Sequence, residues 1–333
     1  MRNAPRRAPM PPEAALPPSR TRSAGLPAAW RRPLLHLAVA WAGLVALAAA
    51  DWIEMARQWW DASTYNHILL VPPILAWLVA QRWPELAKLA PQTWRPSLAI
   101  LAVGLLTWLA GRVLAINTVS QLGAIAMLQA SVAVLLGPRV VAGLLFPLAY
   151  MVFLVPFGDE MVPALQAITA RLAVALTHAS GVPAVIDGVL IDTPAGLFVV
   201  AEACSGVKFL VAMVALGTLV AHLCFASWKR RAAFMLAAVI VPVLANGVRA
   251  WGTIYIAQSQ GIEFAAGFDH IVYGWIFFAL VMIAVLGASW RFFDRSPDDP
   301  LIDAAALEAS PLLARLAPRR GDGGPFAAGA VAD

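Results

Sequence analysis

Charged residues are scarce in this sequence, and their scarcity excludes an ordinary soluble domain. Only 13% of the 333 residues are charged, whereas 61% are hydrophobic. A soluble domain has roughly a quarter charged residues and about half apolar ones, so we predict a membrane protein. The net charge of +5 does not indicate nucleic-acid binding, because the basic residues lie in short clusters between apolar runs, where they act as topology determinants.

Cysteine and the common catalytic motifs are nearly absent as well. Two cysteines in the whole chain give no disulfide framework. The sequence has no C-x-x-C, no Gly-rich phosphate loop, no G-x-S-x-G and no H-E-x-x-H, so the usual signatures of thiol redox couples, nucleotide sites, serine hydrolases and zincins are missing. We interpret the acidic pairs Asp159-Glu160 and Asp187…Asp192 as solvated loop charges, and expect no metal and no cofactor.

Long apolar runs are what the sequence does have. A membrane span needs about 20 apolar residues. Eight candidate spans cover residues 34–50, 67–81, 97–115, 119–137, 140–157, 206–226, 232–256 and 271–290. The second is short and carries Pro72-Pro73, which predicts a kink or a partial crossing. We therefore predict an all-α polytopic membrane protein with about eight transmembrane helices, whose membrane domain covers 34–290 between a disordered cytoplasmic arm (1–33) and a disordered cytoplasmic tail (291–333).

The basic residues predict the orientation of these spans. If the N-terminus is inside, most of the 24 Lys and Arg residues fall in inside segments, as the positive-inside rule requires. Both termini are then cytoplasmic. Cys204 precedes the span at 206–226, Arg249 lies in the outer part of the next span, and His270 opens the last one. All three residues are thus expected at the outer leaflet.

One long outer loop, residues 158–203, leads into Cys204. Its first part has apolar residues at helical spacing, which predicts a helix on the membrane surface or against the bundle. These residues are Met161, Leu165, Ile168, Leu172 and Leu176. Its second part has turn signals at Asp187-Gly188 and Pro194-Ala195-Gly196 around short apolar runs, which predicts a small hairpin before the Cys204 helix.

Cys204 is the candidate nucleophile. A free thiol has a pKa of about 8.5 and reacts as the thiolate. Cys204 precedes a helix start at Ser205-Gly206, where unpaired N–H groups and the helix dipole favour an anion. Lys208 would add positive charge one turn later. Cys224 lies twenty residues further on, or about 30 Å along a helix, too far for a disulfide with Cys204.

Two further residues complete the candidate site. His270, preceded by Asp269, is the candidate general base that takes the thiol proton and later protonates a leaving amine. Arg249 is the candidate partner for an oxyanion or a substrate carbonyl, because an intramembrane arginine is costly. Taken singly, such residues usually pack, snorkel or line an interface. Their joint placement at one leaflet favours the functional interpretation.

Other polar residues are weaker candidates. Glu202 and Asn246 are candidates to orient the arginine or the histidine, and which does which stays open. N–H groups near Ser205 would help to hold an oxyanion. His67 opens the second candidate span on the outer side and is a further site candidate.

Three motifs in order resemble the exosortase family. They are Ala-Cys-Ser-Gly at 203–206, Asn-x-x-Arg at 246–249 and Asp-His-x-x-Tyr-Gly-Trp-x-Phe-Phe at 269–278. Thr64-Tyr65-Asn66-His67 followed by Leu70-Val71-Pro72-Pro73 also looks like that family's second span, and the Asp-His-Ile-Val-Tyr-Gly-Trp stretch is similar to the exosortase A type. The resemblance covers roughly residues 34–290.

The resemblance implies a bacterial inner-membrane cysteine transpeptidase or protease with its site on the periplasmic face. Its substrates would be exported proteins that end in a Pro-Glu-Pro-type motif, a membrane span and an Arg-rich segment. The family's Cys, Arg and His match Cys204, Arg249 and His270. A thioacyl-enzyme would be resolved by an unknown acceptor amine or by water. The roles of Lys208 and of Asn66, which precedes His67, stay open.

Two other classes of function remain open at the level of the sequence. One is a non-enzymatic membrane component of exopolysaccharide export or assembly, in which Cys204 would do no covalent chemistry. The other is a thiol redox or lipid-acyl carrier protein at the same leaflet, and the absence of C-x-x-C weighs against its redox form.

Overall fold

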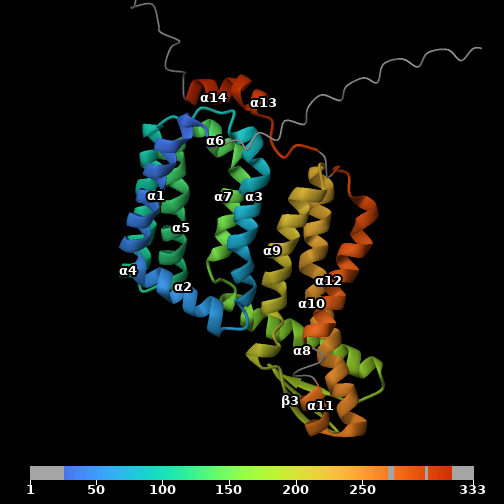
Figure 1. The fold of residues 1–333 in the computed structure, drawn as a ribbon. Helices are drawn as coiled ribbons and strands as arrows, with labels where there is room; N and C mark the ends of the chain where they lie inside the picture. The colour runs from blue at the N-terminus through green and yellow to red at the C-terminus, as the bar shows by residue number, and fades with distance from the viewer. Residues whose placement is uncertain (1–25, 269–273, 297–298, 317–333) are drawn as a thin grey trace, which may run out of the picture.

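Nearly parallel helices form the body of the molecule (Figure 1). The computed structural model describes residues 26–268, 274–296 and 299–316. Within this part, the long axis of the bundle is followed by α1 (Ala28–Leu47), α3 (Val71–Leu86), α4 (Leu98–Val113), α5 (Asn117–Leu136), α6 (Pro138–Gly143), α7 (Leu145–Tyr150), α9 (Val207–Cys224), α10 (Trp228–Gln260) and α12 (Gly274–Ser289). This arrangement confirms the prediction of a polytopic helical membrane protein.

Different elements cover the two ends of the bundle (Figure 1). One end, here the sheet end, carries α2 (Ala49–Asp61), α8 (Val162–Ala179), α11 (Ile262–Phe268) and the strands β1 (Val185–Asp187), β2 (Leu190–Thr193) and β3 (Gly196–Val199). The other, here the tail end, carries α13 (Ala304–Ala309) and α14 (Pro311–Leu316). Short 3-10 turns join the elements at residues 66–70, 95–97, 151–154, 159–161, 202–204 and 290–292.

The predicted number of eight spans is not confirmed. Among the described residues, four helices are long and apolar enough to cross a membrane, or up to six if each bent pair is one span. The four are residues 95–113, 117–136, 202–224 and 228–260. The bent pairs are 28–47 with 49–61, at 83°, and 145–154 with 159–179, at 67°. α3 has only 16 residues, with Pro72 and Pro73 in its first turn and Pro84 near its end, so its proline content limits its length.

Glycines allow α4 and α5 to approach closely. A Cβ atom on Gly123 of α5 would lie 2.3 Å from the backbone nitrogen of Trp108. One on Gly111 of α4 would lie 2.2 Å from the backbone nitrogen of Ser120. Small residues at helix contacts are the usual means of close packing in membranes, because apolar side chains gain nothing there by leaving water.

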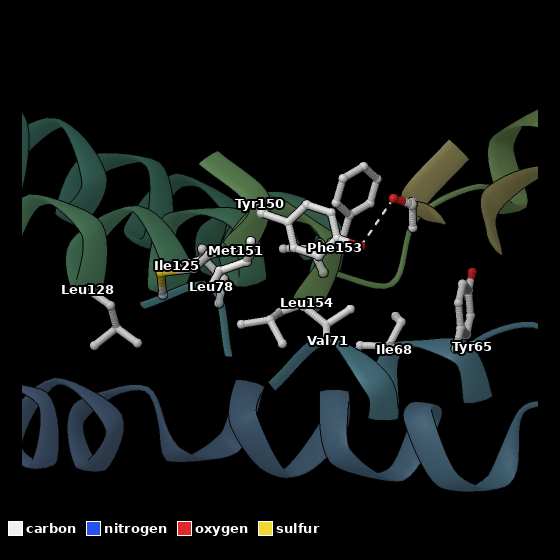
Figure 2. Close-up of a cluster of buried hydrophobic side chains, with 12 residues drawn as sticks. Tyr65, Ile68, Val71, Leu78, Ile125, Leu128, Tyr150, Met151, Phe153 and Leu154 are labelled. Carbon is white, nitrogen blue, oxygen red and sulfur yellow. Dashed lines mark hydrogen bonds between the residues drawn. The ribbon is translucent and has the colours of Figure 1, made fainter. Parts of the chain in front are cut away.

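A hydrophobic cluster joins the two halves of the bundle (Figure 2). It contains Ile68, Leu78, Ile125, Tyr150 and other buried residues. The hydroxyl of Tyr150 donates a 3.1 Å hydrogen bond to the carbonyl of Ala215 in α9 (Figure 2). Since this bond satisfies the hydroxyl of Tyr150, α7 packs against α9 without leaving that donor unpaired in an apolar environment.

Buried polar side chains fix α2 against the bundle. The carboxylate of Asp51 is 4% exposed. It accepts hydrogen bonds from the hydroxyl of Ser120 at 2.6 Å and the indole of Trp108 at 2.9 Å. Arg112 lies 3.8 Å away. These partners come from α4 and α5, so the carboxylate ties three helices together at the sheet end.

A second buried pair joins α3 to α9 toward the tail end. Arg82 is 1% exposed and donates to the carbonyl of Leu78. The Nη2 atom of Arg82 lies 2.8 Å from Nε2 of His222. The ring of His222 stacks on Phe146, with 3.6 Å between the ring centres. His222 therefore packs within the bundle, far from the outer leaflet at which the candidate site is predicted.

The loop before Cys204 is more structured than the sequence predicts. The predicted hairpin exists, but a third strand joins it, and the sheet has the order β1-β2-β3 with both pairs antiparallel. The all-α description is therefore wrong for residues 185–199. Gly188 and Gly196 have φ of +61° and +133°, which gives each tight turn a residue that tolerates positive φ.

α8 packs against α10 with a face that overlaps the predicted stripe only in part, at Leu165 and Leu172. Its buried residues are Leu165, Thr169, Ala170, Ala173, Val174 and Thr177. The predicted stripe residues Met161 and Ile168 are instead exposed. Polar Thr169 and Thr177 face inward with hydrogen-bond partners, which hydrophobic periodicity alone does not detect. The prediction of a helix against the bundle is confirmed.

Part of the tail is helical, although the sequence predicts disorder from residue 291. Two short helices, α13 (Ala304–Ala309) and α14 (Pro311–Leu316), lie against the bundle. Asp303 caps α13 by accepting hydrogen bonds from the backbone of Ala305 and Ala306. Ala304 is buried in a cluster with Leu86 and Leu136, and Trp94 donates to the carbonyl of Leu316. Short apolar patches in an Ala-rich stretch are sufficient here because the bundle supplies the surface that buries them.

The α4–α5 contact gives a direct test of the packing. Gly123→Ala should lower stability by about 1–3 kcal/mol, because the methyl group overlaps backbone atoms and forces the helices apart. Gly43→Ala is the matched control, since a Cβ atom there meets nothing within 4 Å. Thermal unfolding of the two variants in the same detergent measures the difference. Equal midpoints would show that close approach of α4 and α5 is unimportant.

Candidate active site

Cys204 sits on a single turn between the sheet and α9. β3 ends at Val199, residues 202–204 form a 3-10 turn, and α9 begins at Val207. The backbone nitrogen of Cys204 donates a 2.9 Å hydrogen bond to the carbonyl of Ala201. The thiol therefore lies three residues before the helix, at its N-terminal side, and both cysteines are free.

Gly206 makes the turn possible. Its φ is +84°, in the left-handed region, where it serves as the N-cap of α9. A Cβ atom on it would lie 2.7 Å from the side-chain carbon of Asn246. Glycine is thus required twice, once for the backbone conformation and once for the close approach of α10.

Asn246 holds the Cys204 turn in place. Its amide nitrogen donates 2.9 Å hydrogen bonds to the carbonyl of Cys204 and to the hydroxyl of Thr169. Asn246 is 2% and Thr169 is 1% exposed. One amide group therefore joins α10, α8 and the backbone of the candidate nucleophile. The sequence predicts Asn246 as an orienting residue for the arginine or the histidine. In the described part of the structure, its amide bonds the carbonyl of Cys204 and the hydroxyl of Thr169.

Cys204 and Arg249 line the same cavity. The cavity has a volume of about 220 Å³ and lies between the sheet and α10. Its lining residues are Ile191, Phe198, Val199, Val200, Cys204, Asn246, Arg249, Ala250, Thr253 and Ile254. Cys204 and Arg249 thus line one mainly apolar cavity, although they are 45 positions apart in the sequence.

Arg249 is held within the protein. It lies on α10 three residues after Asn246, so the two side chains share one helix face. Arg249 is 7% exposed. A buried arginine within a membrane helix carries a large desolvation cost, which favours a role in binding or catalysis.

Three residues near Cys204 are placed outside the cavity lining. Glu202 is exposed, although it begins the turn that carries the thiol. Ser205 is buried, and its hydroxyl accepts a 3.4 Å hydrogen bond from the backbone of Val207. The ammonium of Lys208 lies 4.9 Å from the ring centre of Phe209.

His67 is not brought into this cavity. Its Nδ1 lies 3.1 Å from the carbonyl of Thr64, and its Nε2 is buried without a hydrogen-bond partner. Neighbouring Tyr65 hydrogen-bonds Asp159, and burial together with that carboxylate raises the pKa of the tyrosine. These residues join the start of α3 to the start of the outer loop. Asp269 and His270 lie outside the described residues, so their approach to Cys204 stays a sequence-based prediction.

Thr169 and the β3 residue Phe198 belong to the site but were not predicted. Thr169 interrupts the apolar face of α8. Apolar periodicity does not identify it as buried, because a polar residue does not contribute to that pattern. Phe198 alternates with exposed Leu197 and Val199. Only the sheet register shows that its ring turns toward α10.

The residues that line the cavity include a thiol and a guanidinium group. Within the described segments, no group of three or more His, Cys, Asp or Glu side chains is arranged to hold a metal ion. The cavity instead offers one nucleophilic sulfur and one fixed cation, a pairing suited to attack on a carbonyl group.

Fold and site together define a multi-pass helical membrane protein with a thiol–guanidinium cavity at one end. A family model described as transmembrane exosortase matches residues 59–287, most of the chain. The chain therefore belongs to the transmembrane exosortase family, as its motifs predict. No curated protein and no solved structure matches it.

The Gly206 turn can be tested with a matched pair of glycines. Gly206→Ala should destabilise the protein more than Gly261→Ala. Both residues have positive φ, +84° and +87°, but only a Cβ atom at 206 meets a neighbour within 4 Å. The extra cost should be about 1–3 kcal/mol. In a Cys224→Ser background, Gly206→Ala should also change the rate at which Cys204 is alkylated. If the two variants behave alike, the Asn246 contact does not position the thiol.

Proposed function

We propose that this protein is a membrane cysteine transpeptidase or protease that cleaves the C-terminal sorting signal of exported proteins. The shared cavity of Cys204 and Arg249 carries the proposal. Membership of the exosortase family supports it, since the signal implied by that resemblance is a Pro-Glu-Pro-type motif, a membrane span and an Arg-rich end. The acceptor would be an amine or water.

The proposed reaction proceeds through a thioacyl-enzyme. His270 takes the proton of Cys204, and the thiolate attacks the carbonyl carbon beside the sorting motif. The carbonyl oxygen becomes an oxyanion, which Arg249 stabilises in an apolar cavity where the charge interaction is strong. The C–N bond breaks, and the leaving amine takes the proton from His270. Attack of an amine or water on the thioester then releases the thiol.

The two ends of the bundle support the proposed orientation. The turn before α10 leads into Lys229, Arg230 and Arg231, and α14 contributes Arg315. These residues belong to the tail end, whereas Cys204 and Arg249 lie at the sheet end (Figure 1). With the basic end in the cytoplasm, the cavity faces the outer side of a bacterial inner membrane.

Exchange of each cysteine tests the nucleophile. In cells that make a tagged substrate, Cys204→Ala should abolish trimming, because no other group forms the thioester. Cys224→Ala is the matched control and should trim normally, since Cys224 is the last residue of α9, at the end far from Cys204. Immunoblots of substrate and enzyme measure the result. Mass spectrometry of the trapped adduct should find the acyl group on Cys204.

Two results would contradict this assignment. If Cys204→Ala trims the substrate at the wild-type level, the covalent mechanism is wrong. Full function of Cys204→Ser would instead favour a non-enzymatic component of exopolysaccharide export or assembly.

Exchange of Arg249 tests the oxyanion role. Arg249→Gln should lower kcat/KM by about 100-fold or more, as expected for loss of an oxyanion partner. The loss should fall mainly on kcat, because the charge is needed in the transition state. Arg112→Gln is the control, since Arg112 pairs with Asp51 away from the cavity. A loss confined to KM would show that Arg249 only binds substrate.

A further inference from the structure

β3 is an edge strand of the three-stranded sheet and lies beside the cavity. In the order β1-β2-β3, strand β3 has β2 as its one strand neighbour within the part of the chain that the structure describes. The side chains of Leu197 and Val199 are 58% and 56% exposed. Edge strands of this kind offer unpaired backbone groups to another extended chain.

The register shows which backbone groups point outward. The nitrogen of Val200 donates to the carbonyl of Val189, so Val200 bonds inward to β2. Paired residues alternate between bonded and non-bonded positions in an antiparallel ladder. Val199, opposite Leu190, therefore turns its N–H away from β2. The same alternation turns the backbone of Leu197 outward.

The opposite edge of the sheet has an equivalent position. Ile191 faces Phe198 of β3 on one side and Ile186 of β1 on the other. Phe198 lies two residues before Val200, so it and Ile191 exchange the inward bonds. Ile186 must then turn its N–H away from β2. Ile186 is thus an edge position like Val199, but it does not line the cavity.

The β3 edge is continuous with the candidate active site. Three consecutive residues, Phe198, Val199 and Val200, line the cavity together with Cys204 and Arg249. The chain then runs from Val199 to Cys204 through one 3-10 turn. An extended peptide bonded to this edge would reach the thiol without leaving the protein surface.

We propose that the substrate binds by adding a strand to β3. The occupant is the extended segment of the exported protein immediately before the scissile bond. Its backbone pairs with the outward N–H of Val199 and the outward carbonyl of Leu197, which delivers the scissile carbonyl to Cys204. The carbonyl of Val199 takes no part, because it accepts a 2.9 Å hydrogen bond from the backbone of Ala201. This inference rests on the proposed function and names how that same site recognises its substrate.

Strand addition at β3 also fixes the direction of the bound peptide. β3 runs from Gly196 toward Cys204, and α9 then continues into the bundle (Figure 1). The proposed substrate likewise runs from its exported part through the motif into its own membrane span. The substrate strand is therefore parallel to β3, and main-chain bonds provide affinity with little dependence on side-chain identity.

Proline substitutions test the edge in cells. Val199→Pro removes the outward N–H and should slow trimming of the tagged substrate about two- to tenfold, as expected for one backbone hydrogen bond. Ile186→Pro removes the equivalent N–H at the other edge and should trim at the wild-type rate. Both prolines occupy edge positions, where proline is tolerated. Equal rates for the two variants, at equal enzyme levels, would overturn strand addition at β3.

Backbone methylation of the substrate provides a second test that leaves the enzyme intact. Synthetic peptides carry the motif and one N-methyl group at each of the four positions before the scissile bond. Purified protein in detergent should show losses in kcat/KM that alternate along the peptide, since alternate N–H groups of a strand face its neighbour.

The two proposals fail in different ways in this assay. Equal effects at all four positions would overturn strand addition, while the proposed function stands if the unmethylated peptide is cleaved and Cys204→Ala is inactive. If wild-type protein leaves the unmethylated peptide intact, the proposed function falls, and this inference falls with it.

Discussion

The side-chain amide of Asn246 is the contact on which the candidate site depends. It bonds the carbonyl of Cys204 and the hydroxyl of Thr169 at 2.9 Å each, and so joins α10, α8 and the turn before α9. A buried polar group left without a partner costs about 1–3 kcal/mol, so each of the three segments is stabilised by the other two. Gly206 lets the amide approach, because any Cβ atom there would overlap it.

Satisfaction of buried polar groups shapes the rest of the bundle in the same way. Asp51 ties α2 to α4 and α5, and Arg82 ties α3 to α9 through His222. In an apolar environment such groups must find protein partners. Each therefore fixes the relative position of two or three helices, whereas the apolar contacts between those helices discriminate poorly between alternative packings.

The site combines these rigid supports with an open edge. Cys204 and Arg249 are held by helices, while β3 beside them has exposed side chains and one strand neighbour in the described part of the chain. Rigid placement would suit the proposed reacting groups, because a fixed charge stabilises an oxyanion without reorganisation. An edge strand would suit the proposed peptide substrate, because main-chain bonds accept varied sequences.

The sequence by itself determined the class of protein, the family and the pairing of Cys204 with Arg249 at one end of the bundle. Apolar run length and basic clusters are local properties, and they fix which span ends lie together. The third strand, the inward face of α8 and the two short helices of the tail were decided only by the tertiary structure. Each depends on contacts between distant segments, as when Thr169 turns inward to meet Asn246 or when Leu86 and Leu136 bury Ala304. Periodicity along one segment carries no information about such partners, because the partner's surface decides which face is buried.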